Sequence, residues 1–190
     1  MTGDEQADIY TKTVVGRDEH FFEDLPGYVV YVPPGSKVED LPNGVEILEA
    51  DYAPGLPEGL LDETLLELLP ELSDEWKLLG LRAPFVALVD LEADSLDRQH
   101  DLARAIETVG DEPPLIALSP APTLDFSGHE LSEMLGDSLR HEMGHHFMRS
   151  QLVLYDEEEE DVVERYALTR DRDVLFEYMK DAPTEDDEKW

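Results

Sequence analysis

The segment from Ser127 to Phe147 constrains the fold of this chain more than any other part of the sequence. Ser127 and Glu130 have the S-x-x-E spacing of a helix capping box, with Phe126 and Leu131 placed as its hydrophobic staple. A leucine, methionine or phenylalanine then recurs every four residues, at positions 131, 135, 139, 143 and 147. This period predicts an amphipathic helix over residues 128–149 with one apolar stripe against a core.

The composition indicates a folded chain with a very acidic surface. Among 190 residues there are 47 Asp and Glu but 14 Lys and Arg, so the formal net charge is −33, while 41% of residues are hydrophobic. We expect one domain, with or without a small appendage. The even spread of carboxylates resembles that of halophilic proteins, because molar salt screens their repulsion. The alternative is an acidic decoy that mimics nucleic acid.

Several classes of protein are disfavoured by what the sequence lacks. It has no cysteine, which excludes disulfides, thiolate nucleophiles and cysteine-based metal sites. It has no cluster of Lys and Arg to neutralise phosphates, so we expect no nucleic-acid partner. No apolar run approaches the ~18 residues of a membrane span, and the acidic N-terminus is unlike a secretory signal. We therefore expect no membrane partner and a cytoplasmic location.

The order of elements predicts an α+β fold with a mixed sheet. Strands are expected at 27–32, 45–50, 85–89 and 115–118, and helices from residue 60 to a disturbance at Pro70, at 94–109, at 128–149 and at 157–180. Residues 53–59 are rich in Pro and Gly, which suggests a linker at a subdomain boundary. Residues 1–59 would then be a β-rich appendage and a candidate lid or pro-segment, residues 60–180 the main domain, and residues 181–190 an acidic tail.

The predicted helix 128–149 contains the motif H-E-x-x-H, formed by His141-Glu142-Met143-Gly144-His145. Residues i and i+4 are about 400° apart, so His141 and His145 leave the same face and can hold one ion at ~2.0–2.1 Å. Glu142 lies about 100° further around, where it can take a proton from a water held by the metal. The motif therefore predicts a catalytic metal centre.

Two neighbours of the motif have structural interpretations. Gly144 costs about 1 kcal/mol inside a helix, which predicts that another element approaches closely there. His146 falls within the apolar stripe, and we expect a packed structural histidine. His20 and His100 are likewise expected to be structural or on the surface.

The third metal ligand is expected to be a downstream carboxylate or a residue from far upstream, because no histidine follows His146. Glu157, Glu160 and Glu164 share a face of the predicted helix 157–180. If residues 151–156 form a symmetric helical hairpin, Glu164 faces position 143, midway between the two motif histidines, and Glu160 faces position 147. Register thus favours Glu164, with Glu160 as the alternative one turn away.

Residues 138–147 resemble the active-site helix of the zincin metallopeptidases. The spacing of 18 residues between His145 and Glu164 is similar to the gap between the motif and the glutamate ligand of gluzincins. The run Glu164-Arg165-Tyr166-Ala167 resembles the E-x-x-A sequence of the minimal gluzincins. The resemblance covers about residues 113–168. It implies a zincin-like core in which an antiparallel helix follows the motif helix, with Zn²⁺ held by His141, His145 and Glu164 and with Glu142 as general base.

The resemblance further implies a peptide or protein substrate and an edge strand, residues 115–118, that lines the cleft. No residue matches the oxyanion-stabilising His or Tyr of the larger gluzincins, and the candidates are Tyr155, Tyr166, Arg140 and His129. The expected function is that of a zinc metallopeptidase. The alternatives are a non-catalytic binding or regulatory module stapled by zinc, which a fourth protein ligand such as His129 or His20 would indicate, and the metal-free decoy.

Overall fold

The computed structural model describes residues 9–15, 28–41, 51–52, 59–90, 103–106, 113–119, 127–151 and 157–182. Within these ranges the fold is α+β, as the order of elements predicts. The strands are β1 (Thr11–Val15), β2 (Tyr28–Val32), β3 (Asp51–Tyr52), β4 (Phe85–Asp90), β5 (Ala103–Ile106) and β6 (Leu115–Leu118). The helices are the short 3-10 turn η1 (Val38–Asp40), α2 (Leu60–Leu78), α3 (Gly128–Ser150), α4 (Glu157–Thr169) and α5 (Asp173–Asp181).

The strands form one mixed sheet in the order β1-β2-β4-β6-β5, and β3 also pairs with β4. β4 and β6 are parallel, with Phe85 opposite Leu115, whereas β5 runs antiparallel to β6 at the edge, with Ala105 opposite Ile116. Since β2 pairs with β4, the strands from residues 1–59 extend the main sheet. The predicted strand 45–50, residues 53–58 of the expected boundary and the tail 183–190 lie outside the described residues.

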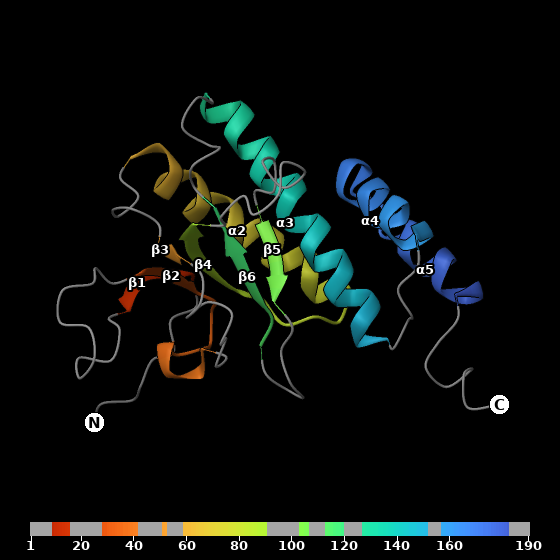
Figure 1. Cartoon of the computed structure of the whole chain (residues 1–190), viewed down its shortest axis with the longest axis horizontal. Helices are drawn as coiled ribbons and strands as arrows, with labels where there is room; N and C mark the ends of the chain where they lie inside the picture. Colours follow the sequence, from red (N-terminus) through yellow and green to blue (C-terminus); the bar gives the residue numbers. More distant parts are fainter. Residues whose placement is uncertain are drawn as a thin grey trace.

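Helices α2 and α3 cover one face of the sheet, and α4 packs against α3 on the side away from it (Figure 1). The core between these layers joins side chains of all of them. Its fully buried members include Tyr31, Leu69, Trp76, Ile116 and Leu139. The opposite face of the sheet is also buried, at residues such as Val30, Phe85 and Leu115. Each central strand is therefore apolar on both faces, as in the runs Phe85–Leu88 and Leu115–Leu118.

The motif helix begins as predicted. Glu130 accepts hydrogen bonds from the backbone nitrogen of Ser127 at 3.2 Å and from its hydroxyl at 2.6 Å, which closes the capping box. Phe126 of the expected staple lies outside the described residues. Within the helix, Arg140 is buried and forms a bidentate ion pair with Glu75 of α2, at 2.8 and 2.9 Å. This pair fixes how α3 lies on α2.

Three predicted elements differ from the structure. Helix α2 continues through Pro70 to Leu78. Residues 103–106, expected within a helix, form strand β5, because they pair along β6 and this non-local pairing overrides the local pattern. The expected helix 157–180 is two helices, since Arg170 adopts a φ of 59° that ends α4 and an Asp171 carboxylate oxygen then accepts the amide of Asp173 at the start of α5.

No helix in the described ranges is long and apolar enough to cross a membrane. This agrees with the absence of a long apolar run in the sequence. Residues 94–102 and 107–109 of the predicted helix 94–109 lie outside the described part of the chain, so only residues 103–106 can be compared with the prediction.

At Gly144, α4 approaches α3 closely, which confirms the interpretation of this glycine. A Cβ placed on Gly144 would lie 2.8 Å from Cγ1 and 3.3 Å from Cγ2 of Val163. Val163 is fully buried and its branched side chain has little freedom to turn away. The absence of a side chain at position 144 thus lets α4 lie directly on the motif.

We predict that Gly144→Ala destabilises the wild-type chain but stabilises a Val163→Ala chain. Overpacking against Val163 costs about 1–3 kcal/mol, more than the roughly 1 kcal/mol that alanine gains over glycine in a helix. In the Val163→Ala background the overlapping methyl groups are gone, so only the gain remains. Urea unfolding of the four chains in high salt measures the free energies. Equal effects of Gly144→Ala in both backgrounds would contradict this account of the contact.

Candidate metal centre

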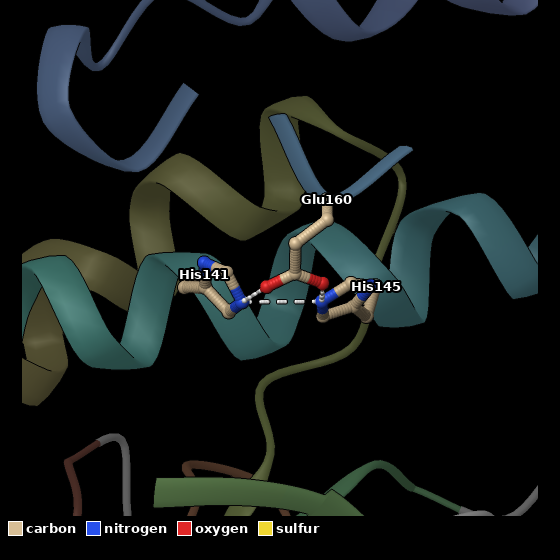
Figure 2. Close-up of side chains that lie close together, drawn as sticks. All are labelled: His141, His145 and Glu160. Atoms are coloured by element: carbon tan, nitrogen blue, oxygen red, sulfur yellow. Dashed lines mark hydrogen bonds and ion pairs between the residues drawn. The ribbon is translucent and has the colours of Figure 1, made fainter. Parts of the chain in front are cut away.

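Three donor side chains meet where α4 crosses α3 (Figure 2). The Nε2 atoms of His141 and His145 lie 3.2 Å apart. The carboxylate of Glu160 spans them, with one oxygen 3.0 Å from Nε2 of His141 and the other 3.2 Å from Nε2 of His145. The structure thus brings together the two histidines of the motif and a carboxylate from the next helix. The sequence predicts this combination of two histidines and one downstream glutamate.

The spacing of these donors is compatible with one bound cation, since one donor atom from each residue lies within 4.8 Å of the other two. A zinc ion with bonds of about 2.1 Å requires its ligand atoms to be roughly 3.4 Å apart, and the two imidazole nitrogens are 3.2 Å apart. Calcium binds six to eight oxygens at about 2.3–2.6 Å and would need a wider, all-oxygen site. Two imidazoles and one carboxylate form the donor set of a catalytic zinc site.

The carboxylate at the centre is Glu160, whereas the sequence favoured Glu164. The axial register of the hairpin is as expected, since Gly144 faces Val163. Rotation about α4 decides the choice: at 100° per residue, Glu160 lies about 60° from the direction of Val163 and Glu164 about 100°. Glu164 is consequently exposed to solvent, one turn further along. Position along α4 is therefore not enough to identify the ligand, because the angle about the helix axis decides which glutamate reaches the histidines.

A second glutamate that the sequence analysis did not single out orients His145. Glu159 is only 2% exposed, and its Oε1 lies 2.9 Å from Nδ1 of His145. Because a carboxylate can only accept, Nδ1 carries the proton and Nε2 is left free to bind a metal. Glu159 lies about 40° from the direction of Val163, on the buried side of α4. Its position one turn before Val163 in the apolar stripe is the signal that could have identified it.

Glu142 points away from the three donors, toward the sheet. Its Oε2 accepts a hydrogen bond of 2.5 Å from the backbone nitrogen of Ala105 in β5. Burial raises the pKa of the Glu142 carboxyl above its ordinary value, and the Ala105 amide and His141 partly oppose this shift. The expected general base therefore lies beside the ligands, on the neighbouring face of α3.

His146 is the packed histidine that the stripe predicts. It is 9% exposed, and burial above all lowers its pKa to about 4, so the ring is neutral at pH 7. Its Nε2 has no hydrogen-bond partner in the described part of the chain. His146 lies one turn beyond Glu142, on the face of α3 that contacts the backbone of Leu115 in β6.

None of the candidate oxyanion-stabilising residues that the structure describes joins the metal centre. Arg140 is held by Glu75, and Tyr166 is buried next to that pair. His129 is exposed on the first turn of α3, where it lies 3.4 Å from Glu133. Tyr155 and His20 lie outside the described ranges.

Comparison of the chain with protein-family models, with curated proteins and with solved structures gives no match. The chemistry of the centre therefore follows from its own side chains. Their exposure shows that the centre is accessible: the side chain of His145 is 11% exposed, that of His141 24% and that of Glu160 48%. A bound ion would lie at the rim of the α3–α4 contact, open on the side of Glu160.

We predict a graded loss of zinc affinity across three matched substitutions on α4. Glu160→Gln removes a ligand and weakens binding by at least about 100-fold, while Glu159→Gln, which removes only the partner of His145, weakens it by about 10–100-fold. Glu164→Gln leaves the affinity unchanged and serves as the control. Competition with a chromophoric chelator measures all three. Loss of zinc in Glu164→Gln but not in Glu160→Gln would reject the assignment of Glu160.

Proposed function

We propose that this protein is a zinc-dependent metallopeptidase with Glu142 as its general base. The observation that carries the proposal is the set of three donors, His141, His145 and Glu160, which offer one ligand atom each within 4.8 Å of one another. Glu142 adds the second requirement, a carboxylate that adjoins the ligands without being one of them. The resemblance of the motif helix to that of the zincins supports the same conclusion.

The number of protein donors favours a catalytic centre over a structural one. Structural zinc sites have four protein ligands, whereas catalytic sites have three and leave a position for water. In the described residues the group contains three donors. His129, one candidate for a fourth, begins α3 three turns before His141, too far to reach the ion.

The residues have distinct roles in the proposed hydrolysis. A zinc ion in such a site supplies a Lewis acid, which acidifies a water and polarises a carbonyl group. His141, His145 and Glu160 hold it, and Glu159 keeps His145 in the required tautomer. Glu142 accepts the proton of the attacking water and returns it to the nitrogen of the departing amine.

The strand that would receive a peptide is β5 and not β6. Residues 115–118 were expected to form the edge strand, but β6 lies between β4 and β5, so both of its sides are paired. β5 is the edge strand next to α3 (Figure 1). A peptide that pairs with the outer side of β5 would run past Glu142, which favours an extended polypeptide as substrate.

A second candidate function is the zinc-stapled module. The observation that favours it is that the donors come from two consecutive helices, so that an ion would tie α4 to α3. The two functions differ in what happens at the open position. A staple holds no exchangeable water and has no use for Glu142, whereas a peptidase needs both.

We predict that Glu142→Gln binds zinc like the wild type but loses peptidase activity by at least about 100-fold, because the amide cannot take a proton. Cleavage of a library of internally quenched peptides measures the activity, in about 2 M KCl because we propose that the acidic surface is adapted to molar salt. Glu164→Gln, an exposed glutamate on α4, is the control and stays active. Full activity of zinc-loaded Glu142→Gln would disprove the assigned role.

A further inference from the structure

We propose that the backbone amide of Ala105 is a positioning group that holds Glu142 in place for proton transfer. This inference rests on the proposed function, since it concerns the base of that reaction. The structural basis is a contact between elements 37 residues apart in sequence: Ala105 N donates to Oε2 of Glu142 over 2.5 Å. No feature of the H-E-x-x-H motif itself supplies this contact.

The sheet geometry leaves this amide free for Glu142. Backbone amides alternate between the two sides of a strand, and that of Ala105 points away from β6, its only neighbour in the sheet order. The edge of β5 lies against α3 (Figure 1), on the face that bears Glu142 and, one turn later, His146. The carboxylate thus bonds to an outward-facing amide of β5 that the pairing with β6 does not use.

The contact restricts the carboxylate in two ways. One oxygen, Oε2, is held by the amide, which leaves Oε1 to accept a proton and prevents rotation of the group. The bond also holds the side chain on the sheet side of α3, whereas His141, His145 and Glu160 meet on the α4 side. A second carboxylate among the donors would be a fourth protein ligand and would occupy the position that a water needs. The Ala105 amide therefore keeps Glu142 a base and not a ligand.

Replacement of Ala105 by proline removes this donor with little effect on the sheet. Proline is tolerated on an edge strand where its nitrogen faces away from the neighbouring strand. Ala103→Pro is the matched control: its amide also faces outward, two residues along the same strand, and no hydrogen bond joins it to Glu142 in the described structure.

We expect zinc-loaded Ala105→Pro to bind zinc like the wild type and to lose about 10–100-fold in kcat, with KM changed by no more than about threefold. Ala103→Pro removes an outward amide of the edge proposed to receive the peptide, so its KM can rise, but it keeps the wild-type kcat because the bond to Glu142 is intact. If the Ala105 amide instead served a bound peptide, KM would rise and kcat would stay the same, and that result would overturn the positioning role.

A second measurement does not depend on activity. In chains labelled with ¹⁵N-alanine, the Ala105 amide should exchange with solvent at least about 10-fold faster in Glu142→Ala than in wild type, because a hydrogen bond to a charged acceptor is lost. The amide of Ala103 should be unaffected. This comparison keeps the proposal testable if Ala105→Pro fails to fold.

The outcomes distinguish failure of the proposed peptidase function from failure of the positioning role of Ala105. If the wild-type chain binds zinc but cleaves no peptide, the proposed function fails and the positioning role falls with it. If the wild type cleaves peptides, but Ala105→Pro is as active as Ala103→Pro or the Ala105 amide exchanges equally in Glu142→Ala, only the positioning role is overturned.

Discussion

The close contact between Gly144 and Val163 determines what the centre of this protein can bind. Because Gly144 has no side chain, the two helices approach until a Cβ would overlap Val163 at 2.8 Å. At that separation the residues beside Val163 on α4 reach the imidazoles beside Gly144 on α3. Glu160 spans both rings, and buried Glu159 fixes one of them. The donor spacing is thus a result of helix packing, and not of the motif alone.

The parts of the site that depend on local sequence could be predicted. The capping box at Ser127 fixes the start of α3, and the i, i+4 spacing places His141 and His145 on one face. The choice among the glutamates of α4 could not be made in the same way. A symmetric hairpin gives the axial register correctly, but the rotation of α4 about its axis depends on which residue packs on Gly144. In a chain with 47 acidic residues, this angle alone selects Glu160 over Glu164.

The contact of Glu142, the proposed general base, depends on pairing that no local pattern encodes. Residues 103–106 lie in a segment with the spacing of a helix, yet they form the edge strand β5 against β6. That strand is the reason why Glu142 has a backbone partner, and it moves the expected substrate edge from β6 to β5. The motif helix therefore presents two neighbouring faces, one toward α4 with the proposed ligands His141 and His145, and one toward the sheet with Glu142.

X-ray absorption at the zinc edge tests the central claim most directly. The chain loaded with one equivalent of zinc in molar salt should show four nitrogen and oxygen ligands at about 2.0–2.1 Å, with the multiple scattering of two imidazoles. A spectrum without imidazole scattering, or with six longer oxygen bonds, would show that His141, His145 and Glu160 do not form the proposed centre. Failure to bind zinc in stoichiometric amount would contradict it equally.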